Sequence, residues 1–233
     1  AEWLRGWTLV GITALASAAA IGFGGYAYLK DGAAERFGTD VRAHIAASAD
    51  FNQDWSRCVV PNEGPFTGVE TCPVGPEGAP AFLVWGDSHV RAFKEGIDLA
   101  AHEAGIAGMV IWTAGCPPLF GITKEESAAT NAEDTACGEI NAQMETALAD
   151  SQTFDRILLI GRWAYYSEGR GVGRDVDNTI TLNGADDPAD QMSAAWARTI
   201  EALGGRYEIT VLRQVPEIPS YDAREFARRL ARG

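Results

Sequence analysis

Hydrophobic residues form one long uncharged run near the start of this chain and several short runs later. The long run extends from Thr8 to Leu29, and a helix needs about 20 apolar residues to cross a bilayer core. Aromatic residues, which prefer the membrane interface, flank both ends of the run: Trp3, Trp7, Tyr26 and Tyr28. The pattern predicts one transmembrane helix within residues 1–30. A signal peptide is the alternative, but its apolar stretch would be only about 7–15 residues long.

The short apolar runs alternate with segments of helical character. Four runs predict buried strands, at residues 81–85, 109–112, 156–160 and 207–212. Helices are expected between and after them, at residues 88–105, 124–150, 188–203 and 219–232. Strands and helices that alternate at this spacing predict right-handed βαβ units and a parallel sheet. Because the strands are apolar throughout, both faces of the sheet should be covered. The predicted fold class is therefore α/β, a parallel sheet flanked by helices and preceded by one transmembrane helix.

This pattern divides the chain into three parts. Residues 1–30 form the span, and residues 31–80 form a linker that contains a short helix and a loop rich in Pro, Gly and Cys. Residues 81–233 form the α/β domain, in which the Gly- and Asp-rich stretch 167–187 is expected to be a loop.

Charge and cysteine content narrow the possible partners and the compartment. A net charge of −13 argues against a nucleic-acid partner, because the phosphate backbone would be repelled. All four cysteines follow the span, and the lack of a close Cys pair argues against a structural metal site. Three disulfide pairings are possible, of which the most local joins Cys58 to Cys72 and Cys116 to Cys137. The alternative is four free thiols in a reducing cytosol. If the disulfides form, everything after about residue 30 lies outside the cytoplasm.

Two glycine-containing turns at predicted strand ends carry candidate chemistry. Ligand sites in open α/β sheets form beyond the carboxyl ends of the strands. Gly86 permits a sharp turn, after which Ser88 would stand at a helix N-terminus, where unpaired N–H groups favour negative charge. That position suits a nucleophile whose intermediate is an oxyanion, although Asp87 or Ser88 as a simple N-cap is the alternative. The amide of Gly115 could approach the same oxyanion, or its loop could merely carry a disulfide.

The stretches FLVWGDSHVRAF, WTAGCPPLFGI, RILLIGRWAYY and VLRQVPEIP resemble the SGNH domain at the C-terminus of acyltransferase-3 membrane O-acyltransferases, over about residues 51–220. The resemblance implies a flavodoxin-like SGNH-hydrolase fold with Ser88 as nucleophile and the N–H groups of Ser88 and Gly115 as oxyanion donors. It implies no cofactor in this domain, because an acyl donor would be supplied through a transmembrane bundle, whose last span would be the initial helix. It also implies a bacterial inner-membrane protein, with residues after about 30 in the periplasm.

The chain departs from the family pattern in two places. Where SGNH hydrolases carry Gly-x-Asn-Asp, this chain has Gly161-Arg162-Trp163, so Arg162 could bind a negative oxygen or substrate, or could be ion-paired structurally. The expected Asp-x-x-His near the end of the domain is missing, and the three histidines are His44, His89 and His102. His89 is a poor base for Ser88, because neighbours on a helix do not face each other. We expect that the chain stops short of the catalytic Asp and His, and that residues 1–233 alone are inactive.

These features predict an O-acyltransferase that transfers acetyl groups and acts on envelope polysaccharide, lipopolysaccharide or peptidoglycan through a serine acyl-enzyme. A glycan acyl esterase uses the same residue types. The non-enzymatic alternative is a membrane-anchored subunit that binds glycan or packs against a membrane complex.

Overall fold

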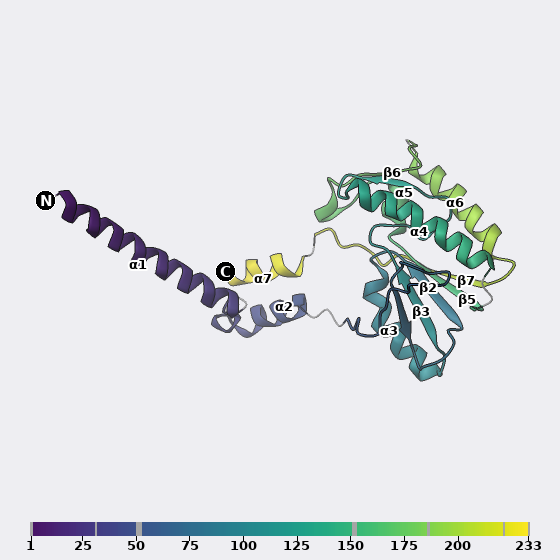
Figure 1. The fold of residues 1–233 in the computed structure, drawn as a ribbon, viewed down its shortest axis with the longest axis horizontal. Helices are drawn as coiled ribbons and strands as arrows, with labels where there is room; N and C mark the ends of the chain where they lie inside the picture. Colours follow the sequence, from purple (N-terminus) through teal and green to yellow (C-terminus); the bar gives the residue numbers. More distant parts are fainter. Residues whose placement is uncertain are drawn as a thin grey trace. The chain divides into compact units, whose positions relative to one another are not determined.

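A five-stranded sheet organises most of the chain in this computed structural model, which describes residues 2–30, 32–49, 53–150, 153–185, 187–220 and 222–232. The strand order is β1-β3-β2-β5-β7. Strands β2, β3, β5 and β7 are labelled in Figure 1. Four strands are parallel: β2 (Phe82–Gly86), β3 (Gly108–Trp112), β5 (Arg156–Ile160) and β7 (Glu208–Leu212). They match the four predicted strands within a few residues, and the α/β fold class is confirmed.

The fifth strand makes the sheet mixed rather than purely parallel. β1 (Thr71–Val74) pairs with β3 in the antiparallel direction and lies in a segment predicted to be a loop. Its sequence, TCPV, contains a proline and has no apolar run to signal a strand. Pro73 is tolerated because an edge strand can leave one side of its backbone unpaired.

Helices cover both faces of the sheet. On one face, α3 (Val90–Ala104) packs over alternate strand residues such as Val84 and Val110. On the other face, residues such as Leu83 and Trp85 join side chains of α4 (Asn131–Asp150) and α6 (Pro188–Leu203). Successive strand residues therefore enter different cores, which explains why the strands are apolar throughout.

Two regions differ from the sequence-based prediction. Residues 124–130, predicted as helix, contain strand β4 (Lys124–Glu126), which pairs with β6 (Ile180–Leu182) from the predicted loop 167–187. That loop region also holds the 3₁₀ turn Gly173–Asp175, and α5 (Trp163–Glu168) extends into it. Helix α4 starts only at Asn131, because Thr130 and Glu133 exchange capping hydrogen bonds there.

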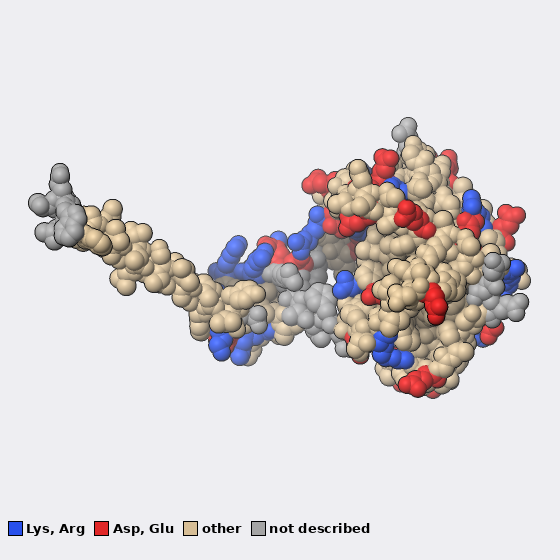
Figure 2. Space-filling view, viewed as in Figure 1, with Lys and Arg blue, Asp and Glu red and all other residues tan. Residues whose placement is uncertain are grey.

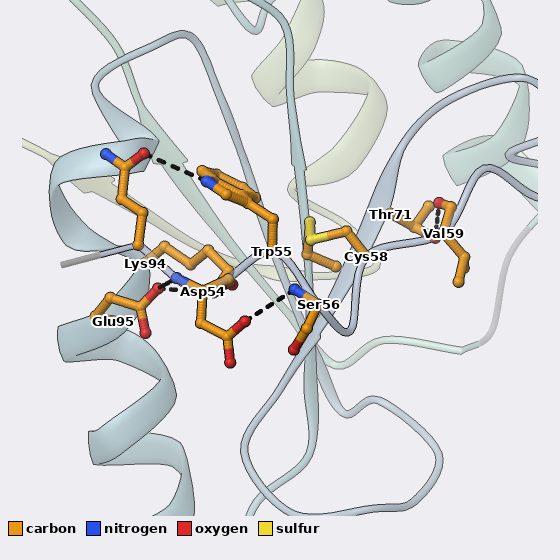
Figure 3. The surroundings of a disulfide bond; sticks show 10 residues. Asp54, Trp55, Ser56, Cys58, Val59, Thr71, Lys94 and Glu95 are labelled. Carbon is orange, nitrogen blue, oxygen red and sulfur yellow. Dashed lines mark hydrogen bonds and ion pairs between the residues drawn. A yellow bond between two sulfur atoms is a disulfide. The ribbon is translucent and has the colours of Figure 1, made fainter. Parts of the chain in front are cut away.

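The structure contains both of the most local disulfides, Cys58–Cys72 and Cys116–Cys137, so this pairing is confirmed. The first joins the segment before the sheet to β1. Figure 3 shows that the same segment is held to α3, where the backbone N–H of Asp54 donates to Glu95 at 2.6 Å. The second disulfide joins the Gly115 loop to α4.

The chain divides into two compact units, residues 52–219 and a smaller unit of residues 1–51 with 220–233. In the smaller unit α2 (Thr39–Ala49) packs against α7 (Ala223–Arg232), and the 3₁₀ turn Ala34–Arg36 precedes α2. α1 (Glu2–Leu29) contains Gly6–Leu29, which is long and apolar enough to span a membrane and is not buried within the structure.

The two units differ in charge. Residues 52–219 carry 25 Asp and Glu against 11 Lys and Arg, a net charge of −14, whereas the smaller unit has 7 acidic and 8 basic residues. Figure 2 shows basic side chains around α2 and α7 and acidic side chains across the visible face of the larger unit.

Candidate active site

The turn between β2 and α3 holds Ser88 at the edge of the sheet. β2 ends at Gly86 and α3 begins at Val90, so Asp87, Ser88 and His89 form the connection at the carboxyl end of the strand. Ser88 is exposed, whereas Asp87 is buried. Ser88 thus lies at the rim of the sheet and not in the core.

Asp87 fixes this turn by accepting three hydrogen bonds. Its Oδ1 accepts from the backbone N–H of His89 at 2.7 Å, and its Oδ2 accepts from the backbone N–H of Arg162 and the hydroxyl of Tyr166, both at 2.7 Å. Burial raises the pKa of Tyr166 well above its ordinary value, and the negative charge of Asp87 raises it further. Tyr166 therefore stays a hydrogen-bond donor, and Asp87 ties the Ser88 turn to the start of α5.

Ser88 and Gly115 line one pocket. A cavity of about 290 Å³ is lined by all four predicted site residues outside the disulfides: Asp87, Ser88, Gly115 and Arg162. Gly115 has a φ of 62°, a conformation that favours glycine. Among the described residues, neither the N–H of Ser88 nor that of Gly115 has a hydrogen-bond acceptor. Two residues that line this pocket thus carry a backbone N–H group without an acceptor among the described residues.

A buried ion cluster supports the Gly115 loop. The ammonium group of Lys124, whose side chain is 2% exposed, lies 2.7 Å from Glu126 and 2.8 Å from Asp134. Tyr165 donates to Glu126 at 2.8 Å, and its pKa is raised mainly by burial. A side-chain carbon on Gly115 would lie 3.0 Å from Glu126 Oε2, so the loop packs closely against this cluster.

Arg162 lines the pocket but is already ion-paired. Its Nε and Nη2 donate to the two oxygens of Glu217 at 2.8 and 2.7 Å, and its Nη1 donates to Asp175 at 3.0 Å. The hydrogen bonds from Arg162 hold the pKa of Glu217 below its ordinary value, with burial acting in the opposite direction. These contacts favour a structural, ion-paired role for Arg162 over a role in ligand binding. An anionic ligand would have to compete with two carboxylates for the guanidinium group.

Comparison with known families identifies the domain. A family model described as the SGNH domain fused to AT3 domains matches residues 57–233, more than half of the chain. The chain belongs to this SGNH family. A search of curated proteins and a search of solved structures found no match. Membership suggests glycan acylation by acyltransferase- or esterase-type chemistry, and the AT3 fusion, together with the apolar helix α1, suggests anchoring in a membrane.

No histidine lines the Ser88 pocket of this SGNH domain within the part of the chain that the structure describes. His89 Nδ1 lies 3.2 Å from Asp87 Oδ1. His102 lies in the last turn of α3, 3.8 Å from Asp98, and His44 belongs to the smaller unit, where its ring contacts Phe226. The expectation that none of the three is the base for Ser88 stays a prediction.

Asn178 lines the Ser88 pocket and was not singled out in the sequence. Its backbone N–H donates to Asp175 at 2.8 Å and its carbonyl accepts from Gly171 at 3.0 Å, so its main chain is fixed. Its side-chain amide has no hydrogen-bond partner among the described residues. It lies ninety residues after Ser88, in a stretch whose composition indicated only a loop, so nothing in the local sequence pointed to the pocket.

Proposed function

We propose that this SGNH domain accepts an acyl group on Ser88 and transfers it to a hydroxyl group of a cell-envelope glycan. The observation that carries the proposal is that an exposed serine shares its pocket with Gly115, and that the backbone N–H groups of both residues lack an acceptor among the described residues. Donors that are already in place and lack an internal partner are what stabilises the oxyanion of acyl transfer.

In the first step Ser88 Oγ attacks the carbonyl carbon of the acyl donor, and an Oγ–C bond forms while the bond to the leaving group breaks. The hydroxyl proton passes to a base and from there to the leaving group. In the second step a sugar hydroxyl attacks the acyl-serine, which releases Ser88 and gives the glycan ester. If water replaces the sugar, the same site is an esterase.

Asn178 is the third donor to the oxyanion in this proposal. The tyrosine hydroxyls in the pocket already donate to Glu126 and Asp87, and the cations Lys124 and Arg162 are already paired with carboxylates. The Asn178 amide is left as the neutral side-chain donor without a partner among the described lining residues. It would take the part of the family's Gly-x-Asn-Asp amide from a different loop.

The setting of the reaction is part of the proposal. Two disulfides favour an oxidising compartment, which for a bacterial inner-membrane protein is the periplasm. The AT3 fusion of the family supports an acyl supply through a membrane bundle, with α1 as an adjoining span. The acyl group is proposed to be acetyl, and the acceptor a polysaccharide, lipopolysaccharide or peptidoglycan.

Labelling of Ser88 by a fluorophosphonate tests the nucleophile. We expect slow labelling of the protein in detergent micelles, because no histidine is among the described residues that line the pocket, and faster labelling when imidazole is added as an external base. Ser88→Ala should remove the label completely under both conditions, as followed by intact-protein mass. No label on Ser88 with or without imidazole would contradict the enzyme proposal and favour the non-catalytic glycan-binding alternative.

Asn178→Ala tests the third donor. The variant should lower the rate of Ser88 labelling by about 10²-fold, since loss of one oxyanion donor costs about 10²–10³ in rate. Its thermal stability should change little, because the side chain has no internal partner. The exposed neighbour Asp177 lies outside the pocket lining, so Asp177→Ala is the control and should label like the wild type. An unchanged labelling rate in Asn178→Ala would remove Asn178 from the proposed site.

A further inference from the structure

A second and larger hollow adjoins the Ser88 pocket. It has a volume of about 1070 Å³ and lies between helix α4 and the β4–β6 pair. It shares Lys124 and Glu126 with the lining of the Ser88 pocket, so strand β4 borders both. We call this hollow the α4 groove, and its size is in the range of ligand sites.

The α4 groove is lined mainly by groups that hydrogen-bond. Its hydroxyl- and amide-bearing residues are Thr123, Ser127, Asn131, Thr135, Thr179 and Thr181. The described lining residues without a polar side chain are Gly138, Ala142 and Gly184, and the carbon atoms of the longer side chains give the groove apolar surface beside its polar groups. Such a lining offers hydrogen-bond partners to a ligand with many hydroxyl groups.

The charge of the α4 groove is negative. Lys124 is its one basic residue within the described lining, and its ammonium group is held by Glu126 and Asp134. Glu125 and Glu139 are exposed in the groove and form no ion pair among the described residues. A phosphate or carboxylate on the ligand would be repelled, whereas the carboxylates can accept hydrogen bonds from sugar hydroxyls.

Hydrogen bonds between the β4 and β6 segments, and between α4 and β4, hold the α4 groove in shape. Ser127 and Thr179 exchange two hydrogen bonds of 2.9 Å, one to a backbone oxygen and one to the serine hydroxyl. Asp134 of α4 accepts from the backbone N–H of Glu126 at 3.1 Å, which fixes the helix to β4. The disulfide Cys116–Cys137 ties the same helix to the Gly115 loop. A preformed groove binds without the cost of ordering its walls.

From this position, lining and charge, we infer that the α4 groove binds the acceptor of the Ser88 reaction and that this acceptor is a glycan segment without phosphate or carboxylate groups. The inference rests on the proposed function, because it assigns the acceptor of that reaction. It predicts that neutral acceptors are preferred over acidic ones. It also predicts that a bulky side chain placed in the α4 groove blocks transfer to the acceptor.

The preference is tested with two oligosaccharides of equal length, an oligogalactoside and an oligogalacturonate, which differ in their carboxylates. With an aryl acetate as donor and imidazole present, mass spectrometry should find at least about tenfold more acetyl transfer to the neutral one at low salt, a preference that salt weakens. Glu125→Gln with Glu139→Gln should reduce the preference several-fold by improving the acidic acceptor. The control pair Glu103→Gln with Glu201→Gln removes equal charge from exposed positions outside the groove and should leave the preference unchanged.

The location is tested with two exposed threonines of α4 that make the same hydrogen bond to the carbonyl four residues earlier. Thr135 lines the α4 groove and Thr146 does not. Thr135→Trp should lower glycan transfer relative to Ser88 labelling by about tenfold, and Thr146→Trp should leave that ratio unchanged. Equal ratios in the two variants, or a preference that the glutamine pair does not alter, would overturn the inference while a labelled Ser88 leaves the proposed function intact. An unlabelled Ser88 would remove the proposed function itself.

Discussion

Gly86→Ala should prevent the protein from folding or lower its free energy of unfolding by about 3 kcal/mol or more. A methyl group at Gly86 would overlap the carbonyl oxygen of Ile160 and lie 2.5 Å from Val90 Cγ2. Gly86 is paired with Ile160 at the end of β5, and Asp87 donates from its N–H to the same carbonyl at 3.2 Å. Because one obstacle is backbone, β2 and β5 would have to separate, and that exceeds the usual cost of overpacking of about 1–3 kcal/mol.

A second glycine in the adjoining helix provides a matched control. Gly96 is exposed in α3, and a methyl group there would meet nothing within 4 Å. Gly96→Ala should therefore raise the free energy of unfolding by up to about 1 kcal/mol, since alanine is favoured over glycine inside helices. Urea unfolding followed by tryptophan fluorescence measures both variants in the same detergent. Wild-type stability in Gly86→Ala would show that the turn before Ser88 tolerates a side chain.

The elements that the sequence predicted correctly are those with local signals. β2, β3, β5 and β7 are apolar throughout because they are buried on both faces, and such runs are visible in any window. β4 consists of Lys124, Glu125 and Glu126, which look like part of an exposed helix. It is a strand because it pairs with β6, more than fifty residues later, and a local pattern contains no information about that partner.

The candidate site also combines residues that the sequence pattern could place with residues whose position depends on tertiary packing. Ser88 and Gly115 follow strands that end at the same edge of the sheet, so their proximity could be predicted from topology. Asn178 and the buried Lys124 enter the pocket from the β4–β6 region, whose position depends on tertiary packing. The ion pairs of Arg162 also depend on Glu217, which lies fifty-five residues later, and the sequence therefore left the two roles of Arg162 open.

Asp87→Ala should lower both stability and reactivity, because it leaves three donors without their acceptor. The N–H groups of His89 and Arg162 and the hydroxyl of Tyr166 all donate to this carboxylate. A buried donor left unsatisfied costs about 1–3 kcal/mol, so we expect a total loss of about 3 kcal/mol or more in the free energy of unfolding. The Ser88 turn would also lose its link to α5, and the fluorophosphonate labelling rate should fall by about 10²-fold or more, measured where circular dichroism shows that the variant is folded.

Tyr166→Phe measures the contribution of one of the three hydrogen bonds that Asp87 accepts, the one from the tyrosine hydroxyl. It leaves Asp87 with its two backbone hydrogen bonds, so we expect a loss of only about 1–2 kcal/mol in the free energy of unfolding and a much smaller decrease in the labelling rate.

The pKa of Tyr166 is raised in the folded state, so the stabilising contribution of Tyr166 is present below about pH 10, the ordinary value for tyrosine, and is lost as pH rises further. Wild-type stability should therefore fall more steeply above pH 10 than that of Tyr166→Phe. Equal losses of stability and labelling in Asp87→Ala and Tyr166→Phe would mean that the hydrogen bond from Tyr166 alone holds the turn. A parallel decline in the stability of wild type and Tyr166→Phe above pH 10 would mean that this hydrogen bond contributes little.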